Sequence, residues 1–216
     1  MKILSLECTA GPASAAITED GRVIASSFIN VKLTHSQTLL PMAEGLFAAA
    51  RLGLSDIDGI AVTAGPGSFT GVRIGICAAN AMAAAFGKPV AAASSLEGLL
   101  YGIDNACALL DCRNGNGYAM VKYEGFSPEP MAVVIDDLLS TLPCGILMAG
   151  DGAVMHRERI LNALPNARFA EGNDITADKI GLAAYDNLIR GETVIEALPL
   201  YLRPSQAERL AKERNK

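Results

Sequence analysis

"LECTAGPASAAITEDG" (residues 6–21) and "LDCRNGNGYAMVKYEG" (residues 110–125) align without a gap, and this repeat indicates the fold. They share a leucine, a cysteine, an alanine and two glycines, and each has an acid in second place, Glu7 and Asp111. Each reads as an apolar strand ending in an acid, then a turn, then a strand with alternating apolar positions. A third strand is expected after each, in "RVIASSF" and "MAVVI".

A later pair of segments extends the repeat. "GIAVTAGPG" (59–67) and "GILMAGDG" (145–152) both read as strands that run into glycines. The sequence therefore predicts an α/β protein made of two β-β-β-α-β-α halves. Chance similarity is the alternative, because short strand-turn-strand pieces share composition as well as ancestry. With a boundary near "YGIDNA", the expected halves are 1–103 and 104–203, and a C-terminal helix at about 204–216 is expected to pack back on the first half.

Two helices are predicted in the first half. "HSQTLLPMAEGLFAAARLG" (35–53) follows Thr34, a good N-cap, and ends on Gly53, a good C-terminal glycine. The next helix, at 70–86, is apolar nearly all round. A helix that covers one sheet face needs a single apolar stripe, so each helix is either deeply buried or docked against another chain. For docking, the expected contact residues are His35, Leu40, Pro41, Gly45, Ala48, Leu52, Val72, Arg73, Ile76, Ala79 and Ala83.

The glycine-rich stretch "AGPGSFTGVRIG" (64–75) separates a strand from the second helix. Such a turn can cradle a phosphate, but this one lacks the lysine of a Walker loop, and Thr70 replaces the third glycine of a dinucleotide fingerprint. The structural interpretation is therefore favoured. Gly65 and Gly67 would supply turn dihedrals, Ser68 or Thr70 would cap the helix, and Gly71 would allow close packing.

Bulk composition excludes several function classes. The 216 residues carry a net charge of -5, which provides no basic field for holding a nucleic acid backbone. No apolar run reaches the roughly 20 residues of a membrane span. The two histidines belong to no ligand pair, so no metal is expected. Five cysteines without a C-x-x-C, behind an N-terminus that reads as a strand, favour the reducing cytoplasm.

The order of these elements, together with "HSQTLLPM", "GPGSFTGVRIG" and "LPLYLRP", resembles the TsaB family, also called YeaZ. The resemblance spans nearly the whole chain. It implies the actin-like ATPase (ASKHA) fold with two RNase-H-like halves. It also implies a non-catalytic scaffold for the transferase TsaD, which acts with the ATPase TsaE to make N6-threonylcarbamoyladenosine at position 37 of tRNAs. The chain would contact tRNA only indirectly, and it could form a homodimer when alone.

The same resemblance implies a degenerate nucleotide cleft. Glu7 and Asp111 would face it, and Gly150 and Gly152 would be relics of an adenosine-binding turn. The turn "CTAGPAS" offers no Lys or Arg for phosphates, so no cofactor is expected in the isolated chain, and ATP only in the complex. The alternative is an ATP-dependent kinase or transferase working in this cleft. A glycoprotease is disfavoured because the sequence offers neither a metal-ligand pair nor a nucleophile with a base.

Overall fold

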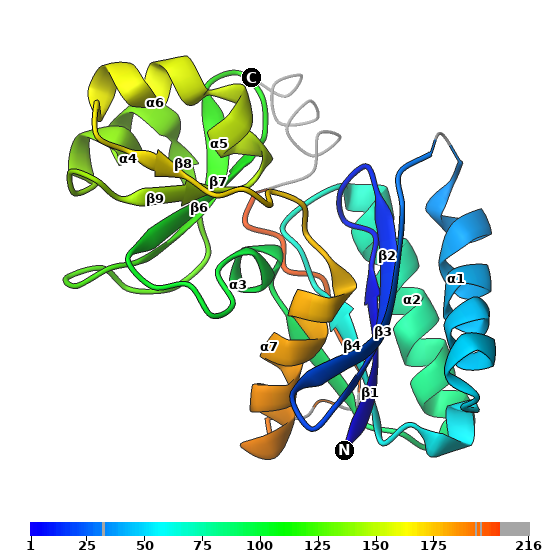
Figure 1. Cartoon of the computed structure of the whole chain (residues 1–216). Coiled ribbons are helices and arrows are strands. Elements are labelled where there is room, and N and C mark those ends of the chain that lie inside the picture. The colour runs from blue at the N-terminus through cyan, green and yellow to red at the C-terminus, as the bar shows by residue number, and fades with distance from the viewer. Residues whose placement is uncertain (32, 193, 195, 204–216) are drawn as a thin grey trace, which may run out of the picture.

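The computed structural model describes residues 1–31, 33–192, 194 and 196–203. It consists of two α/β halves, each built on one five-stranded sheet (Figure 1). Strands form where the sequence has short runs that are apolar or alternate between apolar and polar residues. Helices form where apolar residues recur every three to four positions.

The first sheet has the order β3-β2-β1-β4-β5. Its strands are β1 (Lys2–Glu7), β2 (Ala13–Glu19), β3 (Arg22–Ile29), β4 (Gly59–Thr63) and β5 (Val90–Ala93). β1, β2 and β3 pair antiparallel, as consecutive hairpins allow, whereas β4 and β5 are parallel to β1 because a helix precedes each. β3 is therefore an edge strand.

The second sheet repeats this topology. β6 (Ala106–Asp111), β7 (Asn116–Lys122), β8 (Met131–Val134), β9 (Leu147–Ala149) and β10 (Arg168–Phe169) lie in the order β10-β9-β6-β7-β8. Read from β8, each strand takes the place of its counterpart in the first sheet, with the same pattern of parallel and antiparallel pairs. The predicted two-half architecture is confirmed.

Helices cover both faces of the first sheet. α1 (His35–Ala50) and α2 (Phe69–Phe86) lie on one face, and α7 (Ala177–Ile189) lies on the other (Figure 1). The remaining helices, placed in or beside the second half, are α3 (Ser95–Leu99), α4 (Ile135–Thr141), α5 (Asp151–Met155) and α6 (Arg157–Ala163).

The position of α7 corrects the predicted division at residue 103. Ala184 and Leu188 of this helix pack against Ile3, Ala61 and Ala91 of the first sheet. The reason is physical: α1 and α2 leave the other face of an apolar sheet bare, and only a further helix can bury it. The C-terminal helix expected at 204–216 lies outside the described residues.

The first predicted helix ends earlier than expected. Thr34 is its N-cap, and the backbone amide and hydroxyl of Thr34 both donate to the side chain of Gln37. The helix ends at Ala50, and its C-cap, Arg51, adopts the left-handed conformation with φ 55°. Gly53 instead precedes a 3-10 turn, η1 (Leu54–Asp56).

The buried stripe of α2 corrects a second expectation. Val72, Ile76, Ala79 and Ala83 are all buried in the core of the first half, so they cannot meet a partner. Small and branched residues at this spacing let α2 lie close to the sheet. The sheet therefore covers the stripe that was expected to contact a partner helix. By length and composition alone α2 could cross a membrane, but this stripe packs inside the protein.

The segment 196–203, here called the C-terminal strap, connects the two halves. Ala197 exchanges two hydrogen bonds with the side chain of Asn80, at 2.9 and 3.0 Å. The amide of Leu200 donates to the carbonyl of Ala64 at 2.8 Å. Arg203 then reaches the second half, where its guanidinium lies 3.2 Å from both Cys112 Sγ and Asn116 Oδ1. The strap thus joins α2 to the β6–β7 turn.

Candidate functional site: an outer helical face and an interdomain cleft

The glycine-rich loop before α2 is fastened to the end of β1. Ser68 is the N-cap of α2 and accepts a hydrogen bond from the amide of Gly71 at 3.3 Å. The amide of Ser68 donates to the carbonyl of Thr9 at 2.7 Å. Thr70 is exposed and does not cap the helix.

Three glycines of this loop serve backbone geometry. Gly65 has φ 101°, which other residues rarely adopt. A Cβ on Gly67 would lie 2.5 Å from the carbonyl oxygen of Thr9, and a Cβ on Gly71 would overlap the carbonyl of Cys8. The loop's glycines therefore bring the start of α2 against the end of β1.

A cleft of about 450 Å³ lies between the two halves. Its lining includes Thr9, Ala10, Gly67, Ser68, Leu110, Asp111, Cys112, Arg113, Tyr118, Asp151, Met155 and Ile175. The first half contributes the turn after β1 and the start of α2, while the second contributes the end of β6 and α5. This is where the repeat places the ends of corresponding strands, so the fold itself creates the cleft.

Asp111, predicted to face the cleft, is held by its neighbours. His156 donates from Nε2 to Asp111 Oδ1 at 2.9 Å, and the amide of Arg113 donates to Oδ2 at 3.1 Å. The amide of Asp111 donates to the carboxylate of Asp151 at 3.1 Å. Burial raises the pKa of Asp151 above its ordinary value. Both acids are therefore tied into local structure, and His156 is a partner of Asp111 that no sequence signal marked.

Glu7, the other predicted acid, does not line the cleft. Its side chain is buried, and Oε1 accepts hydrogen bonds from the amide and the hydroxyl of Thr9, both at 2.6 Å. Burial raises the pKa of Glu7 above its ordinary value, and the bonds from Thr9 oppose that shift. The structure therefore does not present Glu7 and Asp111 as a pair of accessible carboxylates.

Gly150 and Gly152 pack against β6 rather than line the cleft. A Cβ on Gly152 would lie 2.9 Å from the amide nitrogen of Asp111, and one on Gly150 would overlap the carbonyl of Leu109. These glycines let the β9–α5 turn approach β6 closely. In the described part of the chain, no three His, Cys, Asp or Glu side chains are grouped so as to hold a metal.

Exposed residues of α1 and α2 form a second candidate surface, here called the outer helical face. It comprises Leu40, Pro41, Gly45, Ala48, Thr70, Arg73, Cys77 and Ala81. Leu40 is 48% exposed. The two helices lie on the same side of the sheet (Figure 1). The surface is mainly small and apolar.

Leu52 and His35, also predicted for docking, have other positions, whereas Arg73 belongs to the outer helical face. Leu52 lies beyond the end of α1 and packs against the core of the first half. His35 donates from Nε2 to the carbonyl of Gly11 at 3.1 Å, which holds the start of α1 to the β1–β2 turn. Arg73 is exposed, and its guanidinium carbon lies 3.8 Å from the ring centre of Phe69.

Comparisons with known proteins support the family that the sequence resembles. The model of the family TsaD, tRNA N6-adenosine threonylcarbamoyltransferase, matches residues 23–139. A "tRNA threonylcarbamoyladenosine biosynthesis protein TsaB" from Bacillus subtilis is 27% identical over 96% of this chain and 96% of its own length. A solved structure, "YeaZ from Pseudomonas aeruginosa", is 29% identical, with a TM-score of 0.78 over 93% of this chain and 99% of that one. The resemblance to TsaB and YeaZ proteins is confirmed.

Other matches are partial or concern the fold alone. A tRNA N6-adenosine threonylcarbamoyltransferase from Geotalea uraniireducens is 33% identical over 45% of this chain, and the match spans only 33% of that enzyme. The match to the TsaB protein of Escherichia coli spans 53% of that protein's length. An activator of 2-hydroxyisocaproyl-CoA dehydratase from Clostridium difficile, 12% identical with a TM-score of 0.56, shares the fold. The actin-like fold predicted from the sequence is thereby confirmed.

Proposed function

The chain belongs to the TsaD family of tRNA N6-adenosine threonylcarbamoyltransferases, and we propose that within it the chain is an accessory subunit of the TsaB (YeaZ) type. Its role would be to dock a longer TsaD-type transferase and support threonylcarbamoyl transfer to adenosine 37 of tRNA. The observation that carries the proposal is the full-length likeness to a TsaB protein, set against a likeness to the transferase that spans a third of that enzyme.

We propose the outer helical face as the docking surface. Leu40 and Pro41 on α1 and Ala81 on α2 are exposed, and a partner helix can approach closely over residues this small. Burying exposed apolar area is worth about 25 cal/mol per Å², so this surface favours association. We thus assign docking, which the sequence suggested for the stripe that includes Val72, to the exposed side of α2.

We also propose that the chain has no catalytic turnover of its own. A phosphoryl-transfer site needs free carboxylates for Mg²⁺ and cations for phosphate. Asp111 is paired with His156 and Glu7 is buried away from the cleft, which supports the accessory role. Arg113 in the cleft lining is the one observation that favours the alternative, an ATP-dependent kinase or transferase.

The wider assembly is part of the same proposal. A TsaE-type ATPase would join the complex, ATP would bind only there, and tRNA would meet this chain indirectly. Without its transferase the chain would pair with its own copy through the outer helical face, since an unpartnered apolar face can be self-complementary across a two-fold axis. The setting would be the cytoplasm.

Calorimetric titration with the purified TsaD-type transferase of the same organism tests the proposal. The wild-type chain is expected to bind, and Ala81→Arg on the outer helical face is expected to prevent binding. Ala163→Arg, the same change at an exposed position of α6, is the matched control and should bind normally. A wild-type chain that does not bind the transferase would overturn the docking role.

A further inference from the structure

β3 has an open edge. Among the described residues this strand pairs with β2 alone, so one side of its backbone has no ladder partner. Alternate residues of an edge strand turn their N–H and C=O groups outward, where a further strand can bind them. Residues 23–29, "VIASSFI", carry neither a charge nor a proline, the usual devices against strand addition.

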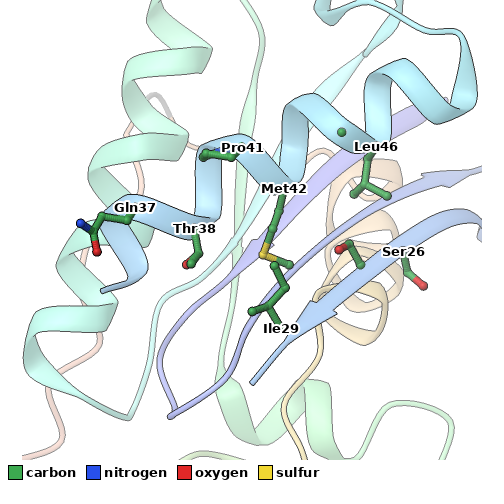
Figure 2. A pocket seen from close by; sticks show the side chains of 9 residues that line it. Ser26, Ile29, Gln37, Thr38, Pro41, Met42 and Leu46 are labelled. Carbon is green, nitrogen blue, oxygen red and sulfur yellow. The ribbon is translucent and has the colours of Figure 1, made fainter. Parts of the chain in front are cut away.

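A hollow of about 500 Å³ lies beside β3 on the face covered by α1. It is lined by Ser26, Ser27, Ile29, Gln37, Thr38, Pro41, Met42, Gly45 and Leu46. Figure 2 shows Met42 extending from α1 toward Ile29 on β3, with Leu46 further along the same helix. The lining of this hollow is therefore mainly apolar, and Ser26, Ser27, Thr38 and Gln37 add hydroxyl and amide groups to it.

A second hollow, of about 310 Å³, borders the same strand on the face covered by α7. Ser14, Ala15, Ser26, Ser27, Phe28, Asp174, Thr176, Ala177 and Asp178 line it. No Lys or Arg belongs to this described lining, and the Asp174 and Asp178 carboxylates make no ion pair with any residue that the structure describes. This hollow is therefore acidic, and no described side-chain cation is paired with its two carboxylates.

We infer that β3 accepts an extended peptide segment of a partner protein as a sixth strand of the first sheet. Successive side chains of a strand point to opposite faces, so one set would enter the apolar hollow under α1 and the alternate set would enter the acidic hollow beside α7. The segment that fits alternates apolar residues with lysine or arginine. Main-chain hydrogen bonds to β3 would hold it, and the two hollows would select its side chains.

The peptide-binding surface proposed here can be tested with residues that lie outside the outer helical face, the proposed contact with the transferase. Pro41 and Gly45 border both surfaces, but Asp178 belongs to α7 and Asp174 precedes it, and α7 covers the opposite face of the sheet from α1 and α2 (Figure 1). Losing peptide binding through these acids would leave transferase binding intact, so the two proposals can fail independently.

Fluorescence anisotropy with a defined peptide tests the inference. The probe is a fluorescein-labelled peptide of eight residues, the length of β3, in which leucine alternates with lysine. A peptide of the same composition with its leucines in one block is the control for non-specific attraction to an acidic protein. The alternating peptide is expected to bind at least tenfold more tightly than the block peptide; equal binding would overturn the inference.

N-methylation of the peptide backbone distinguishes a peptide that pairs with β3 as a strand from one that only fills the hollows with its side chains. Two further peptides carry N-methyl groups on alternate residues, one set on the leucines and one on the lysines. Only the set whose N–H groups point away from β3 can keep the ladder, so one peptide should bind and the other should not. If both bind, or neither does, no ladder forms and the inference is wrong.

Variants of the chain then test the acidic hollow. Replacing both acids, Asp174→Asn with Asp178→Asn, should weaken binding by about three- to tenfold, the range expected for two exposed charge pairs. Asp137→Asn, an exposed acid of α4, is the matched control and should change nothing. A second copy of this chain is the competing occupant: a dimer in the absence of peptide, with slow hydrogen exchange along β3, would overturn the assignment to a partner peptide.

Discussion

Arg73 donates a hydrogen bond from Nε to the hydroxyl of Tyr201 at 2.9 Å, and these residues are separated by most of the chain. Tyr201 also stacks on Phe69, with ring centres 5.1 Å apart, and the Arg73 guanidinium lies over the Phe69 ring. The contact joins "GPGSFTGVRIG", which begins α2, to residues 198–203 of "LPLYLRP", which belong to the C-terminal strap. Two segments that stand out in the sequence are therefore parts of one packed unit.

Removing this arginine should destabilise the chain modestly. Arg73→Ala removes a cation–π contact and a hydrogen bond, so we expect the free energy of unfolding to fall by about 1 to 2 kcal/mol. Tyr201→Phe keeps the stacked ring and loses only the hydrogen bond, so its cost should be about half as large. Urea unfolding measures both values, and equal losses would mean that the cation–π contact between Arg73 and Phe69 contributes nothing.

Two alanines on α2, one buried and one exposed, should respond oppositely to the same change. Ala79 is fully buried against the first sheet, so Ala79→Arg should cost about 3 kcal/mol or more and give an unfolded or aggregated chain. Ala81→Arg places the charge in water and should melt normally by circular dichroism. A stable, well-folded Ala79→Arg chain would contradict the packing of α2 described above.

Glycines on the two helices give another matched pair. Gly71→Ala would drive a methyl group into the Cys8 carbonyl, so about 1 to 3 kcal/mol of stability should be lost. Gly45→Ala meets nothing within 4 Å, and an alanine inside a helix should stabilise the chain by about 0.5 to 1 kcal/mol. Thermal and urea unfolding report both effects. A destabilised Gly45→Ala chain would show that α1 is not exposed there.

Glu7 should make stability depend on pH. Its pKa is raised in the folded chain, so above the ordinary value of 4.5 the unfolded state releases a proton that the folded state still holds. The unfolded state then binds fewer protons, and the free energy of unfolding falls as pH rises until it passes the folded pKa.

Glu7→Gln should remove this contribution, because the amide oxygen can still accept both hydrogen bonds from Thr9 and has no charge to desolvate. Urea unfolding of both chains between pH 4 and 9 tests this. The wild-type free energy should decline relative to the variant as pH rises. Parallel curves would mean that Glu7 titrates normally despite its burial.

The fold was predictable because its signals are local. Strand-turn-strand repeats, N-caps such as Thr34 and apolar periodicity all act within a few residues, and they yielded both halves, the start of α1 and the bounds of α2 to within one residue. The place of α7 was not predictable in this way, since its buried residues match an apolar sheet face and nothing in its own segment says which one.

The candidate site was predictable only in part. Leu40, Pro41, Gly45 and Ala48 of α1, which the sequence singled out, are exposed. By contrast, α2 has apolar residues on nearly every side, and sequence alone could not say which stripe the sheet would cover. The partners of Asp111 and Arg73 were also hidden, because His156 and Tyr201 come from distant segments brought close by the fold.

The amount of N6-threonylcarbamoyladenosine formed in a reconstituted reaction tests the central claim most directly. The mixture holds the TsaD-type transferase, the TsaE-type ATPase, tRNA and the threonylcarbamoyl donor, with or without this chain. The account predicts that wild-type chain and Asp111→Asn both support modification, while Ala81→Arg does not. Full modification with Ala81→Arg and none with Asp111→Asn would contradict it, because the chain would then act through its cleft as an enzyme.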